Sequence, residues 1–136
     1  MTRILRLALA LLALAAAPIV AQEGPERDFG QQLFPPELVM QYQQKIGLRP
    51  EQRRAITEAI AQLQSRVVDL QWRMQEETQK LSELLQPARA DEAEVLAQVD
   101  RVLAIEREVK RAHLAMLVRI KNALTPEQQA ALKALR

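Results

Sequence analysis

The sequence predicts an all-α protein in which two long helices form an antiparallel hairpin, flanked by short helices. Two observations predict the helices. The chain of 136 residues has no glycine after Gly47, and two long stretches beyond it repeat apolar residues at alternating steps of three and four. Such heptad rows are typical of helices that pack against each other at a shallow angle.

The first 21 residues have the layout of a secretory signal peptide. A short basic start with Arg3 and Arg6 precedes an apolar run, and the segment ends in the small residue Ala21. We expect cleavage after Ala21 and no stable membrane insertion afterwards. The run from Leu7 to Ala21 has 15 residues, fewer than the roughly 20 needed to span a bilayer. An uncleaved membrane anchor is the alternative.

Without this segment the chain has no net charge. The 19 basic residues fall to 17 when Arg3 and Arg6 are removed, and they face 17 acidic residues. A nucleic-acid partner is not expected, because such binding needs a basic stripe. The absence of cysteine excludes disulfides, thiolate metal sites and a lipid-modified N-terminal cysteine.

A polar segment and a short helix come next. Residues 22–34 are polar and show no periodicity, so we expect a flexible N-terminal arm. Pro35 and Pro36 then introduce a helix from about Glu37 to Ile46, since proline is tolerated in a first helical turn. Gly47 should end this helix by adopting a positive φ.

The first long helix is expected from Pro50 to about Gln86, where Pro87 stops it. A charged residue, Glu77, interrupts its apolar row. That row comprises Ile56, Ile60, Leu63, Val67, Leu70, Met74, Leu81 and Leu84.

The second long helix is expected to begin near Asp91, whose side chain can cap it. The connection of residues 86–90 is short, so the two long helices should be antiparallel. Thr125 then caps a final short helix that begins at Pro126. The apolar row of the second long helix, interrupted at Glu106, comprises Val95, Val99, Val102, Val109, His113, Met116 and Ile120.

Several apolar residues lie off these two rows and indicate a homodimer. They are Val68, Trp72, Ile105 and Leu114. Apolar surface that a helix pair leaves uncovered usually contacts a second copy or a partner. The alternative is that the short helices fold back and complete a monomeric bundle.

Two helix starts repeat one motif. Residues 48–52, Leu-Arg-Pro-Glu-Gln, open the first long helix, and residues 124–128, Leu-Thr-Pro-Glu-Gln, open the last one. In the second copy, Thr125 can cap the helix while Gln128 bonds back to the cap residue. In the first copy Arg49 occupies the threonine position and cannot accept that hydrogen bond.

Paired motifs around a long helical hairpin, together with an export signal, resemble the Spy/CpxP family of periplasmic proteins. The family motif is Leu-Thr-x-x-Gln, and the residues that match it are Leu48, Gln52, Leu124, Thr125 and Gln128. The resemblance covers about residues 35–136. It implies a periplasmic, cradle-shaped dimer that acts as an ATP-independent chaperone or restrains envelope-stress signalling. Its partners would be unfolded proteins or a sensor kinase domain. A related branch, similar to CnrX and ZraP, binds transition metals through histidines.

A chaperone surface has to be partly apolar and partly charged. Methionine suits it because the side chain is flexible and polarizable, although Met74 and Met116 would also suit ordinary core positions. Arginines at the start of the first long helix should lie near the basic end of the second and attract acidic partners. The candidate client-binding residues are Met40, Arg49, Arg53, Arg54, Trp72, Met74 and Met116.

Metal binding is the alternative function, and catalysis is not expected. Glu106 and Met116 share a helical face with His113, the only histidine, so these three residues could form a metal site. The only serines, Ser65 and Ser82, lie inside a helix far from His113 in sequence, which indicates no activated nucleophile. We therefore expect no catalytic residue and no cofactor.

Overall fold

The structure, a computed structural model, describes residues 29–136, and every regular element in this range is a helix. The all-α prediction is therefore confirmed for the described part of the chain. The predicted signal peptide and residues 22–28 of the predicted arm lie outside it. The helices are α2 (Pro36–Gln41), α3 (Pro50–Leu85), α4 (Glu92–Ala123) and α5 (Pro126–Ala134).

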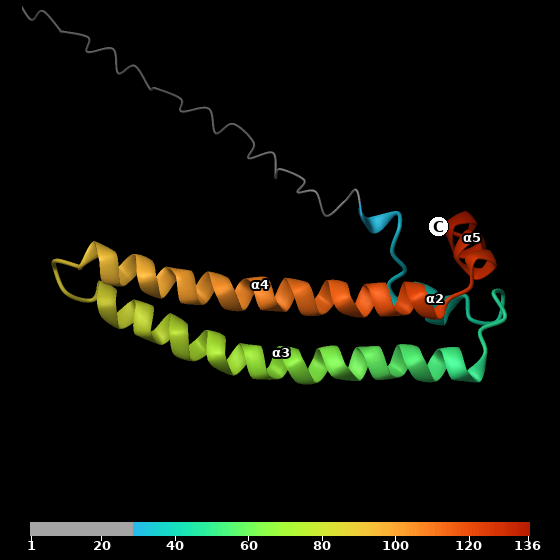
Figure 1. Ribbon diagram of the computed structural model, residues 1–136, viewed down its shortest axis with the longest axis horizontal. Coiled ribbons are helices and arrows are strands. Elements are labelled where there is room, and N and C mark those ends of the chain that lie inside the picture. Colours follow the sequence, from blue (N-terminus) through green and yellow to red (C-terminus); the bar gives the residue numbers. More distant parts are fainter. Residues whose placement is uncertain (1–28) are drawn as a thin grey trace, which may run out of the picture.

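The long helices α3 and α4 lie side by side and run in opposite directions (Figure 1). Pro50 occupies the first turn of α3, where its missing N–H leaves no helical hydrogen bond unmade. At the start of α4, the Asp91 carboxylate accepts a hydrogen bond from the Glu94 N–H at 3.1 Å. With 36 and 32 residues, the two helices are about 54 and 48 Å long.

The apolar row predicted for α3 is confirmed. Ile56 and Leu70 are buried, and the remaining members of the row are half-buried. Glu77 continues the row as a half-buried polar residue. A row with this spacing keeps facing one neighbouring helix along its whole length.

The apolar row predicted for α4 is wrong at two positions. Ile105, which we placed outside the row, is only 2% exposed, whereas His113, which we placed within it, is exposed. The covered side of α4 passes from Ile105 through Val109 and Ala112 to Met116, in steps of four, three and four. Ala112 did not stand out in the sequence, because alanine suits a helix interface and a solvent-facing surface equally well.

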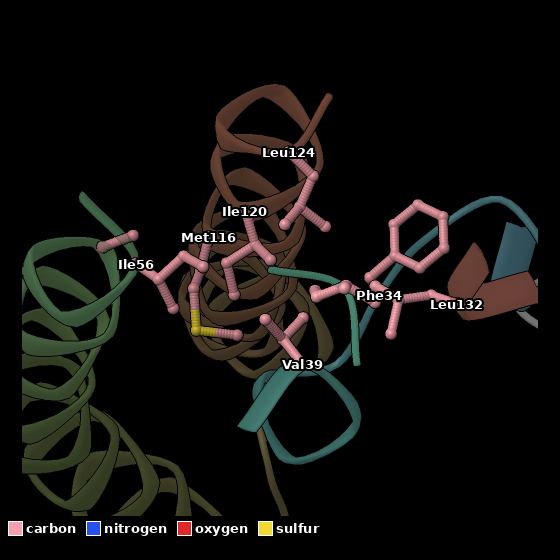
Figure 2. Packing of buried hydrophobic residues seen from close by; sticks show 9 residues of the cluster. Phe34, Val39, Ile56, Met116, Ile120, Leu124 and Leu132 are labelled. Atoms are coloured by element: carbon pink, nitrogen blue, oxygen red, sulfur yellow. The ribbon is translucent and has the colours of Figure 1, made fainter. Parts of the chain in front are cut away.

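The hydrophobic core lies at one end of the α3–α4 pair, where α3 begins and α4 ends. The short helices α2 and α5 pack there, and the rest of the pair consists of two helices alone (Figure 1). Figure 2 shows Val39 of α2 close to Ile120 of α4, and Phe34 beside Leu132 of α5. The core comprises Phe34, Val39, Ile46, Ile56, Ala59, Met116, Ile120, Leu124 and Leu132.

Phe34, which we expected in a flexible arm, belongs to this core. Its side chain is fully buried, and the cationic groups of Lys121 and Arg136 lie 5.5 and 5.3 Å from the ring centre. Lys121 Nζ also donates a hydrogen bond to the Gln32 carbonyl oxygen at 2.9 Å. The aromatic side chain of Phe34 therefore anchors the segment before Pro35 to the core.

The helix α2 ends at Gln41, earlier than expected, and turns continue to Gly47. The Leu48 N–H closes this segment by donating to the Gln43 carbonyl oxygen at 2.9 Å. Gly47 has the predicted positive φ, +64°, a backbone conformation that favours glycine.

Candidate interaction surface

The two repeated helix starts meet, and their glutamines bond to each other. Gln52 Nε2 donates to Gln128 Oε1 at 2.7 Å, and Gln128 Nε2 donates to Gln52 Oε1 at 3.0 Å. Both side chains are buried. This pair joins the first turn of α3 to the first turn of α5 across 76 residues of sequence.

Each glutamine also completes its own helix start. Gln52 Oε1 accepts from the Arg49 N–H and Gln128 Oε1 accepts from the Thr125 N–H, both at 2.9 Å. Thr125 Oγ1 accepts in return from the Gln128 N–H at 3.1 Å. Arginine has no acceptor, so the start of α3 lacks this second hydrogen bond, as predicted.

The glutamines also bind the chain that precedes the opposite motif. Gln52 Nε2 donates to the Ala123 carbonyl oxygen at 2.8 Å, and Gln128 Nε2 lies 3.4 Å from the Gly47 carbonyl oxygen. Each carbonyl stands five residues before the glutamine of its own motif, so the two contacts are equivalent in sequence position. The amide atoms of both side chains are fully used, and the pair therefore serves the fold rather than a ligand.

Large apolar side chains lie exposed outside the core. On α3, Val68 and Trp72 are one turn apart, and Trp72 is 67% exposed. On α4, four residues lie on one side of the helix, because their separations of seven, eleven and four residues are close to whole turns. We call them the α4 ridge: Leu96, Leu103, Leu114 and Val118.

The candidate client-binding residues divide between surface and interior. Trp72 and Met40 are exposed, Met74 is half-buried, and Met116 is only 4% exposed. Met116 therefore fills the core and is not available to a partner. Three of the candidates are exposed arginines at the start of α3: Arg49, Arg53 and Arg54.

Basic residues at the start of α3 and near the end of α4 lie at the end that holds the core, because the helices run in opposite directions. At the start of α3, Arg49 Nε lies 3.3 Å from a Glu51 carboxylate oxygen, and Arg53 donates to Gln43 at 3.3 Å. From α4, Arg119 donates a hydrogen bond to Gln62 of α3. Acidic residues at the far end include Glu83, Glu92 and Glu94.

Two polar contacts between α3 and α4 were not predicted from the sequence. Glu108 of α4 forms ion pairs with both Arg66 and Arg73 of α3. Further along, the buried Gln98 donates from Nε2 to the carbonyl oxygen of Glu77 at 2.8 Å and to its carboxylate at 2.6 Å. The sequence spacing could have revealed the Gln98 contact, because Gln98 lies three residues after Val95 and so falls on the covered side of α4.

Hydrogen bonds determine the ionisation of Glu77. The Lys80 ammonium group, 2.9 Å away, and the Gln98 amide both bind the charged carboxylate and lower the pKa of Glu77 below its ordinary value of 4.5. Partial burial opposes this shift but is the weaker effect. Glu77, which interrupts the apolar row of α3, is therefore a carboxylate held by hydrogen bonds at the interface between α3 and α4.

Two shallow, open recesses lie on α3, and this helix alone lines each of them. One, near the helix start, is lined by Pro50, Arg53, Arg54, Thr57, Glu58 and Ala61. The other contains no ionisable side chain and is lined by Gln71, Met74, Gln75, Thr78, Gln79 and Ser82.

The three residues of the alternative metal site do not come together. His113 and Glu106 are exposed, whereas Met116 points into the core (Figure 2). Within residues 29–136, no group of three or more histidine, aspartate or glutamate side chains could hold a metal ion. The shared face predicted for these residues is wrong for the same reason as the predicted row of α4.

None of the helices in the described range is long and apolar enough to cross a membrane. Comparisons with protein-family models, curated proteins and solved structures gave no match to this chain.

Proposed function

We propose that this protein is a periplasmic, ATP-independent chaperone or envelope-stress regulator that binds unfolded or sensor proteins. One observation carries the proposal: Val68, Trp72 and the α4 ridge leave apolar surface exposed along two long helices. The core occupies one end of the helices and covers none of these side chains. Large apolar side chains that stay exposed along one side of a helix favour a protein interaction site.

The character of the α4 ridge suits a partner without fixed shape. Exposed charged residues, Arg107 and Arg111, stand between Leu103 and Leu114 along the helix. A convex surface of alternating apolar and charged side chains offers no pocket for one rigid anchor residue. Such a surface favours weak binding to many segments, each with its own mixture of apolar and acidic residues.

A homodimer is part of the proposal. The α3–α4 pair forms an antiparallel hairpin about 50 Å long, and its exposed apolar side chains fall on both helices. An isologous contact between two hairpins would cover part of this surface and create a longer, cradle-like assembly.

The location in the periplasm rests on the sequence. Residues 1–21 have the layout of an export signal, and the two motifs resemble those of the Spy/CpxP family. The Gln52–Gln128 pair gives the motifs a common physical role, since both take part in one junction. That role is structural and leaves the surface of the long helices for partners.

The proposal is tested by aggregation of a reduced, unfolded protein, followed by light scattering without ATP. The mature protein should suppress scattering at near-stoichiometric ratios. Leu103→Gln combined with Leu114→Gln should weaken this suppression several-fold, because two apolar contacts of the ridge are lost. Glutamine is a good helix former, so α4 should persist.

A matched control places glutamines elsewhere on α4, at the exposed Ala97 and Ala115. Ala97→Gln with Ala115→Gln should suppress scattering as well as the wild type. A wild-type protein that leaves the client to aggregate unchanged would contradict the proposed function. If the ridge variant and the alanine control lost the same amount of aggregation suppression, the proposed role of the α4 ridge would be contradicted.

A further inference from the structure

One side of α3 combines exposed side-chain amides with apolar side chains, and none of its members is charged. We define this amide face by its residues: Gln64, Val68, Gln71, Trp72, Gln75, Thr78, Gln79 and Ser82. All eight are exposed. We propose that the amide face binds the peptide backbone of an extended, unfolded segment, independently of its side-chain charges. The inference rests on the proposed function and adds the surface and the chemical feature that is recognised.

The charges of this stretch of α3 lie on a different side of the helix. Apart from Glu77 in the covered row, they recur in steps of three and four, at Arg66, Asp69, Arg73, Glu76 and Lys80. Arg66 and Arg73 reach Glu108 of α4, which locates this charged row beside the partner helix. The members of the amide face are therefore uncharged over more than four helical turns, with the Glu83 carboxylate at its edge accepting a hydrogen bond from Gln79.

The amide face includes the uncharged recess on α3, with Met74 at its edge. Within the described part of the chain, the side-chain amides of Gln71 and Gln75 make no hydrogen bond. Gln79 Nε2 donates to Glu83 at 3.1 Å, and its oxygen remains an acceptor. A row of amides that can both donate and accept thus lines an open hollow.

The spacing of these glutamines fits an extended chain. Gln71, Gln75 and Gln79 are four residues apart, which is a rise of about 6 Å per step. Peptide groups on one edge of an extended chain recur every two residues, or about 6.6 Å. The mismatch is under about 1 Å per step, within the reach of a flexible side chain. Trp72 and Val68 lie alongside and can cover apolar side chains of the bound segment.

The backbone of a folded helix cannot bond to this row of amides. The backbone N–H and C=O groups inside a helix are already bonded to each other, so α3 of a second copy would present only side chains to the glutamines. An unfolded segment has unpaired backbone groups at the required spacing. In backbone hydrogen bonding, the amide face therefore distinguishes an extended client from a folded neighbour.

The test uses two synthetic probes: an uncharged, end-capped peptide of serine, threonine and valine, and its analogue with alternate backbone nitrogens methylated. Methylation removes hydrogen-bond donors on one edge and keeps every side chain. The full mature protein should bind the unmethylated peptide about tenfold more tightly, as expected for a few backbone hydrogen bonds. The variant Q71A/Q75A/Q79A should lose this preference, and alanine should preserve the helix.

A matched control removes three exposed amides outside α3, at Gln31, Gln41 and Gln44. Q31A/Q41A/Q44A should keep the preference. Equal binding of the two peptides by the wild type would overturn the inference, as would a preference that survives in Q71A/Q75A/Q79A. A dimer that dissociates in Q71A/Q75A/Q79A would also overturn it, because the face would then seat a second copy. Failure of the proposed function is separate: the wild type would then leave the aggregation of unfolded proteins unchanged.

Discussion

Gln52 and Gln128 form a reciprocal pair in which each side-chain amide donates to the other and accepts from it. The arrangement requires glutamine at both positions. A glutamate would lose the donor and bring negative charge into a buried site, and an asparagine would be one methylene too short. The two copies of the repeated motif thus supply the two halves of one contact, which joins the start of α3 to the start of α5.

Replacing Gln128 by leucine should lower the free energy of unfolding by about 1–3 kcal/mol, because each amide atom of Gln52 would lose one buried hydrogen bond and the Ile46 carbonyl oxygen would lose its Gln128 donor. Urea unfolding followed by circular dichroism measures this. Leucine at the exposed Gln44 is the control, and its effect should stay within about 0.5 kcal/mol.

The double variant Gln52→Leu/Gln128→Leu tests whether the pair is coupled. Its loss of stability should be smaller than the sum of the two single losses, because neither leucine leaves the other amide unpaired. Strict additivity would show that the two side chains act independently.

Phe34→Ala should cost about 3–5 kcal/mol of unfolding free energy, as expected for a fully buried phenylalanine. Phe29, five residues earlier and 58% exposed, provides the matched control. Phe29→Ala should change stability by less than about 0.5 kcal/mol. Similar effects of the two substitutions in urea unfolding would mean that the segment before α2 is not anchored.

Ile105 and His113 test which side of α4 is covered. Ile105→Ala should destabilise the protein by about 2–5 kcal/mol because it opens a cavity between α3 and α4. His113→Ala should be nearly neutral, since its side chain is exposed. If His113→Ala had the lower unfolding midpoint of the two variants, the row predicted from the sequence, with His113 on the covered side of α4, would be right.

The lowered pKa of Glu77 makes part of the stability depend on pH. A carboxylate with a lowered pKa in the folded state contributes stability above its unfolded pKa, and the contribution is lost as pH falls through the folded value. Glu77→Gln keeps an acceptor for Gln98 and removes the titration. The stability difference between wild type and variant should therefore be constant near neutral pH and change progressively below pH 4.5.

Denaturant unfolding at a series of pH values measures this dependence. Glu83→Gln, at an exposed carboxylate near the end of α3, is the control. A wild-type profile parallel to that of Glu77→Gln down to pH 3 would show that the Lys80 and Gln98 contacts do not hold the carboxylate charged.

The helices could be predicted closely because local signals agree along the chain. Proline at the first turn of α3, Asp91 before α4 and Thr125 before α5 each supply a known start signal. The row of α3 was also predictable, since large aliphatic residues fill it except at Glu77.

The error on α4 arose because side-chain volume is a poor guide where a small residue faces a helix. On α4 the inward position between Val109 and Met116 is Ala112, so the larger His113 drew the prediction to the wrong side. The burial of Phe34 depends on α5, about 100 residues later, and no local pattern could reveal it. The Gln52–Gln128 contact was equally non-local: the motif was visible, but not the contact between its two copies.

Because the core lies at one end of the helix pair, we expect the two ends to differ in local stability. Beyond Leu70 and Ile105, toward residues 86–91, no apolar side chain in the described range is fully buried. Local opening of that far end therefore costs little free energy, while the glutamine junction stays closed. The far end of the helix pair, where residues 86–91 connect α3 to α4, is therefore the more easily deformed end.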